Sequence, residues 1–186
     1  MSLEVASVGP GSPGADAVLR IVDVSFPERE RYSDQFLFRK LSDPGARLLS
    51  FSDGGEVVGM SYVVERGDEL FILYLAVDPS ARSRGYGGEM LGILDSMYPG
   101  HRQYLCIEPL VPCDDYADRL RRFRFYTRNG FKDTGLDLTS DAGDFHLLSK
   151  GGLDLDAYTE LRWSFFERDT PYRRRGHAHP GSDRTV

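Results

Sequence analysis

The chain has 186 residues, of which 40% are hydrophobic and 28% charged, as is ordinary for a folded globular protein. This length predicts one domain with a full hydrophobic core. The formal net charge of −6 argues against a general nucleic-acid-binding protein, which would usually be basic. No apolar run approaches the length of a membrane span, and the N-terminus lacks a signal-peptide pattern. We therefore expect a cytoplasmic protein with neither nucleic acid nor membrane as a partner.

The cysteines and histidines predict neither a disulfide framework nor a metal site. Cys106 and Cys113 are too few for a framework, and no Cys-x-x-Cys or paired histidine completes a set of ligands near them. His177 and His179 are two residues apart in a basic tail, where solvated side chains are the simpler interpretation.

The N-terminal part predicts a loose segment, a strand and short helices. Residues 1–14 are rich in Gly, Ser and Pro and are interpreted as a flexible leader. Ala17–Val24 is β-branched with an alternating pattern, which predicts a first strand. Glu28–Leu41 is expected to hold one or two short helices, with Ser33 or Asp34 able to cap the second.

A three-strand meander is predicted next. Arg47–Ser52 and Glu56–Arg66 flank Asp53-Gly54-Gly55, a strong hairpin signal. Glu69–Val77 is almost continuously apolar, which indicates a strand covered on both faces.

Helices and strands alternate in the second half of the chain. The expected order is a helix at Glu89–Tyr98, a strand at Gln103–Glu108, a helix at Tyr116–Asn129, a strand pair at Lys132–Thr139 and Asp144–Leu148, and a helix at Leu153–Arg168. Asn129-Gly130 fits a left-handed C-cap. The tail after Thr170 is expected to be poorly ordered. We thus divide the chain into a leader (1–14), one domain (15–150), and a C-terminal helix with a basic tail (151–186).

Leu75–Leu91 carries the clearest functional pattern. Arg82 and Arg84 lead into Gly85-Tyr86-Gly87-Gly88, which is followed at once by a helix. Glycines allow backbone amides to approach a ligand closely, and a helix start offers unpaired amides and a dipole that favours anions. With two arginines beside them, these parts predict a binding site for a diphosphate. An ordinary turn between strand and helix is the alternative.

The two commonest phosphate motifs do not fit this stretch. A P-loop needs Lys followed by Ser or Thr after its last glycine, where this chain has Glu89-Met90. The dinucleotide fingerprint needs Gly or Ala where Met90 stands.

The pattern that remains, Arg82-x-x-Gly85-x-Gly87 after a strand ending Val77-Asp78-Pro79, resembles the coenzyme A loop of the GNAT family of N-acetyltransferases. A second motif, Phe125-Tyr126-Thr127-Arg128-Asn129-Gly130-Phe131, is similar to the Phe-Tyr-x-x-x-Gly-Phe of that family. The order of predicted elements also resembles a GNAT fold, over about Ala17–Lys150.

The resemblance implies an α+β fold whose central sheet is mixed but mostly antiparallel, has about seven strands and is flanked by helices. The fourth and fifth strands, Glu69–Val77 and Gln103–Glu108, would splay apart to admit the pantetheine arm of acetyl-CoA. The residues expected to bind this cosubstrate are Ala76 and Val77 on the strand, and Arg82, Arg84, Gly85, Tyr86, Gly87 and Gly88 in the loop.

Two catalytic residues are expected from the resemblance. Tyr126 matches the family tyrosine that often protonates the departing thiolate. A phenol with a pKa of about 10 can act as this acid, because it keeps its proton at neutral pH. A pure packing role for Tyr126 is the alternative. Glu69 is at the wrong end of its strand for the glutamate that serves many relatives as base. Glu108 is therefore the preferred base, with a solvated strand-end charge as the alternative; His146 and a water chain are further candidates.

One departure from the family pattern concerns Arg119. Many relatives have an asparagine at this place, which contacts the cofactor. Arg119 or Arg122 could reach a phosphate instead, although a charge run on a helix is more often a solvated face.

The predicted function is acetyl-CoA-dependent N-acetyl transfer to a primary amine of a small molecule or peptide, without a metal. The first alternative is a catalytically degenerate acetyl-CoA sensor or interaction module. The second is a nucleotide- or phosphate-binding protein that uses the glycine loop alone. Leu153–Arg168 is expected to pack outside the catalytic core, against either the same chain or a second subunit in a homodimer.

Overall fold

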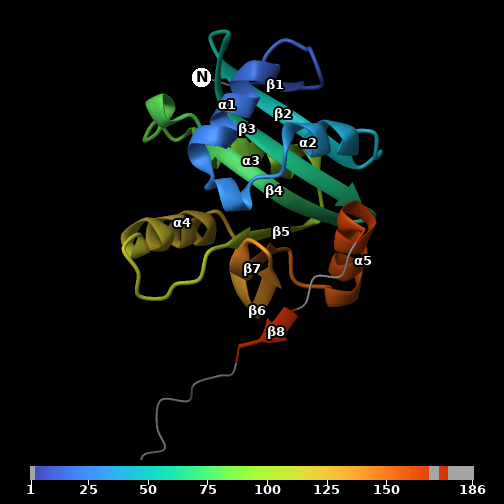
Figure 1. Cartoon of the computed structure of the whole chain (residues 1–186), viewed down its shortest axis with the longest axis vertical. Helices are drawn as coiled ribbons and strands as arrows, with labels where there is room; N and C mark the ends of the chain where they lie inside the picture. The colour runs from blue at the N-terminus through green and yellow to red at the C-terminus, as the bar shows by residue number, and fades with distance from the viewer. Residues whose placement is uncertain (1–2, 168–171, 176–186) are drawn as a thin grey trace, which may run out of the picture.

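The computed structural model of the chain describes residues 3–167 and 172–175. Its centre is one mixed sheet in the order β1-β2-β3-β4-β5-β7-β6-β8, with helices on both faces (Figure 1). Of the described strand pairs, β4–β5 is parallel and the others are antiparallel. The structure confirms the predicted α+β fold.

The strands are β1 (Glu4–Ser7), β2 (Ala46–Asp53), β3 (Glu56–Arg66), β4 (Glu69–Val77), β5 (Arg102–Ile107), β6 (Lys132–Ser140), β7 (Gly143–Lys150) and β8 (Tyr172–Arg174). The α-helices are α1 (Ala15–Ser25), α2 (Asp34–Lys40), α3 (Tyr86–Met97), α4 (Tyr116–Arg128) and α5 (Leu155–Phe166), and the 3₁₀ helices are η1 (Glu28–Glu30) and η2 (Pro79–Ala81). The predicted meander corresponds to β2–β4 and the later strands to β5–β7.

The N-terminal prediction of a strand over Ala17–Val24 is wrong, since this segment lies in helix α1. Val18, Ile21 and Val22 are buried at helical spacing, and the β-branched composition obscured that period. The first strand, β1, lies instead within the segment interpreted as a leader. It pairs with β2 through backbone hydrogen bonds, and its side chains are mostly exposed. Backbone pairing needs no apolar pattern, so the sequence carried no signal for this strand.

A β-bulge interrupts β4 at Leu73. Tyr62 of β3 pairs with Tyr74, and the next residue, Val63, pairs with Ile72, so Leu73 has no opposite residue. A bulge breaks the alternation of faces. As a result Leu73 and Tyr74 both pack with the core under α1, α2 and α5, whereas Ile72 packs with the core under α3.

The predicted splay of the sheet lies between β4 and β5. Their pairing covers Glu69–Phe71 and Arg102–Tyr104 and then stops, although β4 continues to Val77. Beyond this point β5 pairs with β7 on its other side. The edge of β4 that faces β5 is therefore open from Ile72 to Val77.

Helix α4 ends in the predicted left-handed cap. Gly130 has φ +93°, its amide donates to Thr127 O, and the Phe131 amide donates to Tyr126 O. These two bonds form a Schellman motif. Phe131 is buried below the helix, which fixes Tyr126 against the sheet.

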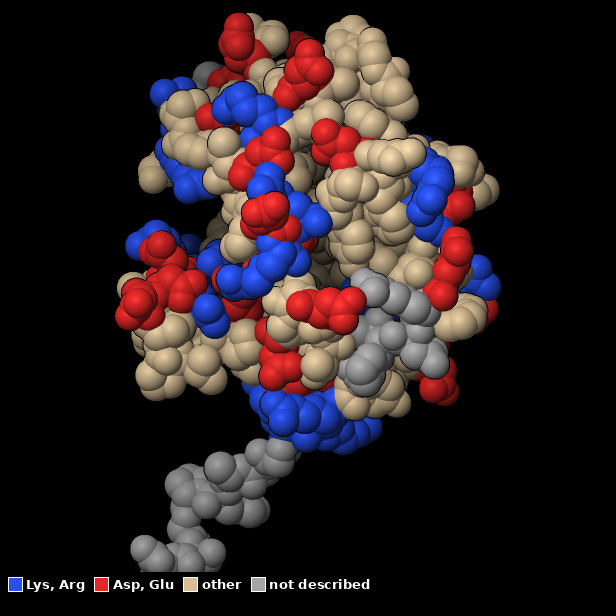
Figure 2. Space-filling model, viewed as in Figure 1, with Lys and Arg blue, Asp and Glu red and all other residues tan. Residues whose placement is uncertain are grey.

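Helix α5 packs on the chain's own sheet. Tyr158, Leu161 and Phe165 are buried, and the Phe165 ring lies 5.9 Å from that of Tyr62. Beyond it, β8 pairs with β6 within the tail that was expected to be poorly ordered. Arg173 and Arg174 of β8, with the following Arg175, form the basic surface at the lower end of Figure 2. His177 and His179 are outside the described residues.

Candidate active site

The glycine loop presents backbone amides at the start of α3. Gly85 (φ +87°) and Ser83 (φ +65°) both have left-handed φ angles, and left-handed residues are a feature of backbone loops that bind anions. For Ser83 this conformation costs on the order of 1 kcal/mol, and such strain concentrates at functional sites.

The amides of Arg84, Gly85, Tyr86 and Gly87 have no acceptor among the described residues. The Gly88 amide, which the sequence assigned to the same role, donates to Gly85 O at 3.1 Å. Unpaired amides at the beginning of a 12-residue helix are suited to an anion. Arg82 and Arg84 are exposed beside them and add positive charge.

Tyr86 itself has a structural side chain. It is buried, and its hydroxyl donates to Asp53 in the β2–β3 turn. The contribution of Tyr86 to an anion site is thus its amide.

Close packing joins the glycine loop to α4. A Cβ on Gly87 would lie 3.0 Å from Phe125 Cζ and 3.7 Å from Val77 Cγ2. Glycine at this position therefore lets the start of α3 approach both α4 and the end of β4. The two motifs singled out in the sequence meet at one place, beside Ala76 and Val77 on the open edge of β4.

Tyr126 lies on the same side of the sheet as α3 and the glycine loop. Its ring packs 5.0 Å from Phe125 and 5.8 Å from Phe131. Burial raises the pKa of Tyr126 to about 12, against a lowering effect of Arg122. The phenol consequently stays protonated at neutral pH and can donate a hydrogen bond or a proton.

Glu108 directly follows β5 and is buried, not a solvated strand-end charge. Its Oε2 lies 2.6 Å from Arg122 Nη1, and its Oε1 lies 4.0 Å from Arg119 Nε. Arg119 also bonds Asp115 and Pro109 O, which directs it to the loop before α4. The carboxylate of Glu108 is therefore engaged by arginine.

His146, the weaker base candidate, is also engaged. Its Nδ1 lies 2.7 Å from Asp137 Oδ1, and its Nε2 accepts from the Leu110 amide at 3.4 Å. It supports the loop after β5.

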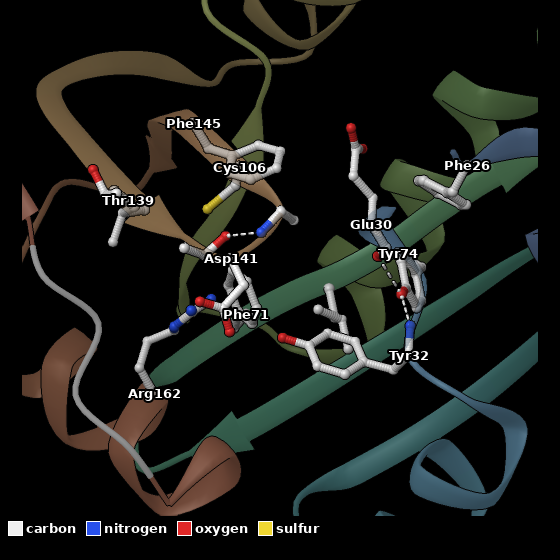
Figure 3. Close-up of a pocket in the computed structure, with 14 residues that line it drawn as sticks. Phe26, Glu30, Tyr32, Phe71, Tyr74, Cys106, Thr139, Asp141, Phe145 and Arg162 are labelled. Atoms are coloured by element: carbon white, nitrogen blue, oxygen red, sulfur yellow. Dashed lines mark hydrogen bonds between the residues drawn. The ribbon is translucent and has the colours of Figure 1, made fainter. Parts of the chain in front are cut away.

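A cavity of about 350 Å³ opens in the splay on the opposite face of the sheet, toward α1 and α5. Figure 3 shows its walls. They are built from Phe26, Glu30 and Tyr32 before α2, Phe71, Leu73 and Tyr74 of β4, Cys106 of β5, residues 138–142 and Phe145 around the β6–β7 turn, and Arg162 of α5. Sequence reasoning missed most of these residues, because none belongs to a contiguous motif.

Glu30 is the carboxylate of this cavity that comes from η1. Its side chain is 11% exposed, and its Oε1 lies 3.3 Å from Arg29 Nη2. Burial raises its pKa, the negative charge of Glu108 raises it further, and Arg29, Arg122 and Arg119 oppose this rise. The net direction is upward.

A family model described as an acetyltransferase (GNAT) domain matches residues 44–133. The match includes β2 to α4, with both motifs and both strands of the splay. The chain carries a GNAT acetyltransferase domain. No curated protein matches the chain in sequence.

Solved structures of GNAT acetyltransferases resemble most of the chain in fold. A putative GNAT acetyltransferase from Bacteroides thetaiotaomicron is 20% identical with a TM-score of 0.70, covering 87% of this chain and 94% of that one. PaiA N-acetyltransferase from Thermoplasma acidophilum, in complex with coenzyme A, is 17% identical with a TM-score of 0.59, covering 81% and 99%. The ribosomal-protein-S18-alanine N-acetyltransferase from Escherichia coli is 16% identical with a TM-score of 0.59, covering 80% and 92%.

The described residues contain neither a candidate metal site nor a candidate membrane span. No group of three His, Cys, Asp or Glu there could hold a metal ion. Within the same residues, no helix has the length and apolar character to cross a membrane.

Proposed function

We propose that the protein transfers the acetyl group of acetyl-CoA to a primary amine of a small molecule or peptide. One observation supports this most directly: the splay between β4 and β5 has unpaired amides at one end and a cavity at the other. A cosubstrate with a diphosphate and a long arm would span these two places.

The cosubstrate would bind by its diphosphate at the amides of Tyr86 and Gly87, with Arg82 and Arg84 close by. Its arm would follow the open edge of β4, where Ala76 and Val77 offer backbone groups. A backbone amide at that edge could stabilise negative charge on the thioester oxygen. Tyr126, held protonated on the same side, would donate a proton to the departing sulfur.

The acceptor would enter the cavity. Its volume of about 350 Å³ is at the lower end of pockets for small molecules. Aromatic rings from Phe26, Phe71 and Phe145 line it, together with the carboxylate of Glu30. Rings and a carboxylate together favour an ammonium group on an apolar body, which is either a small amine or the end of a peptide.

The test combines binding and turnover. Calorimetry with acetyl-CoA, ATP and NAD, followed by thiol release over a panel of amines, should show selective acetyl-CoA binding and turnover of at least one amine. Acetyl-CoA binding without any turnover would favour the sensor alternative. Binding of ATP or NAD in place of acetyl-CoA would favour a phosphate-binding protein.

A matched pair of variants tests the loop itself. Gly88→Glu places a negative charge at the third position of α3, where a Cβ has 3.6 Å of room from Asn129 Oδ1 and helices accept glutamate. Gly92→Glu makes the same change in the same helix, at an exposed position with nothing within 4 Å. We expect Gly88→Glu to weaken acetyl-CoA binding at least tenfold through charge repulsion, an order-of-magnitude expectation, and Gly92→Glu to leave it unchanged. Equal affinities would place the diphosphate elsewhere.

A further inference from the structure

We propose that Glu30 is the general base of this enzyme: its carboxylate binds the ammonium group of the acceptor and removes its proton. The inference rests on the proposed function and adds to it a catalytic residue from outside both sequence motifs. Glu108, the base expected from the sequence, would then have a supporting role.

The location of Glu30 favours this role. It lines the cavity together with Phe71 and Leu73 of β4 and Cys106 of β5, the two strands that splay apart. Figure 3 shows its side chain extending away from Tyr74, between Phe26 and Phe145. An amine bound in this cavity would reach the splay with a carboxylate beside it.

Tyr74 holds Glu30 in place. Its hydroxyl donates to Glu30 O at 2.8 Å and accepts from the Tyr32 amide at 2.9 Å, and its ring packs 4.6 Å from Phe26. Tyr74 faces the cavity because the bulge at Leu73 shifts the alternation of β4. The segment Phe26–Tyr32 is therefore fixed to the strand that would carry the thioester.

The neighbouring charges give Glu30 and Glu108 different chemistry. Glu108 lies 2.6 Å from Arg122, so its oxygens already accept from a permanent cation. Glu30 has the weaker, 3.3 Å contact with the exposed Arg29. The other titratable side chains that line the cavity include Tyr32, Asp141 of the β6–β7 turn and Arg162 of α5. Burial and the negative charge of Glu108 raise the pKa of Glu30, so its carboxylate takes up a proton more readily than an ordinary glutamate.

The proposed step balances as follows. Glu30 takes one proton from R–NH3+, and the nitrogen lone pair forms a C–N bond to the thioester carbonyl carbon. The C–S bond then breaks with its electron pair on sulfur. The sulfur takes a proton, a second proton leaves the nitrogen, and Glu30 returns its own to solvent. The products are the N-acetyl amide, the coenzyme thiol and one released proton.

The experiment measures kcat/KM against pH for wild type, Glu30→Gln, Glu108→Gln and Glu28→Gln, with an amine that wild type turns over. Glu28 is the matched control, since it is exposed on the same 3₁₀ helix and does not line the cavity. For Glu30→Gln we expect a loss on the order of 10²-fold at neutral pH. The loss should shrink toward the pKa of the amine, about 10, because free amine no longer needs a base. Acetyl-CoA affinity and thermal unfolding should match wild type.

The outcomes separate the inference from the proposed function. If wild type turns over an amine while Glu30→Gln matches it, or shows the same loss at every pH, Glu30 is not the base. A pH-rescued loss in Glu108→Gln but not in Glu30→Gln would return the role to Glu108. If wild type binds acetyl-CoA but turns over no amine, the proposed function fails, and the inference fails with it.

Discussion

At the scale of residues, the two proton transfers are assigned to opposite faces of the splayed sheet. Tyr126 lies with α4 and the glycine loop, whereas Glu30 lies in the cavity toward α1 and α5. Arg122 influences both groups, since it pairs with Glu108 and opposes the rise in the pKa of Tyr126 and of Glu30. A substitution in the Arg122–Glu108 pair should thus change the pKa of both Tyr126 and Glu30.

Tyr126→Phe removes one hydroxyl and keeps the ring that packs against Phe125 and Phe131, so it should alter packing little. Acetyl-CoA affinity should hardly change, and kcat should fall on the order of 10²-fold if the phenol protonates the sulfur. Steady-state kinetics with calorimetry on the same preparation measures both. Equal rates for the two proteins would assign Tyr126 to packing alone.

Glu108→Gln removes a negative charge near Glu30 and leaves Arg122 without its carboxylate. Both effects favour the charged form of Glu30 and lower its pKa. The acidic limb of the pH profile should therefore move to lower pH, while the activity at high pH falls less than tenfold, a rough expectation for a supporting group. A limb that stayed in place would contradict the coupling between these carboxylates.

The sequence predicted some of these residues and not others for a physical reason. The glycine loop and Tyr126 belong to contiguous motifs, in which backbone geometry depends on nearby residues. Glu30 reaches the site through a tertiary contact with Tyr74, which itself depends on the bulge at Leu73. No local pattern around Glu30 reports that contact.

At the scale of elements, the connection between β4 and α3 is held by Asp78. This buried residue caps η2 by accepting from the Ser80 amide at 2.9 Å and from the Ser80 hydroxyl at 2.6 Å, and it pairs with Arg20 of α1. One side chain thus fixes the turn before the glycine loop and ties it to α1.

Asp78 should give the protein a specific sensitivity to acid. The Ser80 hydrogen bonds, with Arg20, lower its pKa from 3.8 to about 2. A depressed pKa contributes stability above the unfolded value, and this contribution is lost as the pH falls from about 4 to 2. Asp78→Asn should lower stability at neutral pH by about 1–2 kcal/mol and flatten the acid loss in that range. Urea unfolding at several pH values measures this, with the exposed Asp114→Asn as control. Parallel curves for wild type and Asp78→Asn would exclude this role.

Tyr74 connects two elements, β4 and the segment before α2. Tyr74→Phe leaves the Tyr32 amide and Glu30 O without their partner, which costs about 1–3 kcal/mol of stability. Because Tyr74 only positions Glu30, the Tyr74→Phe protein should have a lower kcat. High pH should not rescue this loss, in contrast to the loss expected for Glu30→Gln. Tyr98→Phe is the control, because Tyr98 is buried like Tyr74 but packs in the other hydrophobic core, under α3. A Tyr74→Phe protein with wild-type kcat would show that the clamp is dispensable.

At the scale of the whole molecule, the sheet separates two hydrophobic cores. One core includes α3, Phe125 and Tyr126, and the other includes α1, α2 and α5. The sequence predicted most strands of this sheet from their alternation and turns. It misplaced the N-terminal elements, because α1 is short and β-branched, and β1 depends on backbone pairing with β2. The cavity could not be predicted, since distant segments of the chain form it together.

Helix α5 was expected to lie outside the catalytic core, yet it contributes Arg162 to the cavity. Substitutions in this helix therefore test whether the acceptor side and the cosubstrate side of the sheet are independent. Phe165 is 1% exposed, and its ring lies 4.8 Å from Phe166 and 5.9 Å from Tyr62. Phe165→Ala should therefore cost about 3–5 kcal/mol of stability. Trp163→Ala, in the same helix but 52% exposed, should cost far less.

Both variants should keep the acetyl-CoA affinity of wild type at temperatures where they are folded, since α5 packs on the core opposite the glycine loop. For Phe165→Ala, KM for the amine should rise, because Arg162 of the same helix loses its fixed position over the rings of Phe71 and Phe166. Thermal unfolding, calorimetry and amine titrations separate these effects. Loss of acetyl-CoA affinity in a folded Phe165→Ala protein would show that the two faces are coupled and that the division into cosubstrate and acceptor sides is wrong.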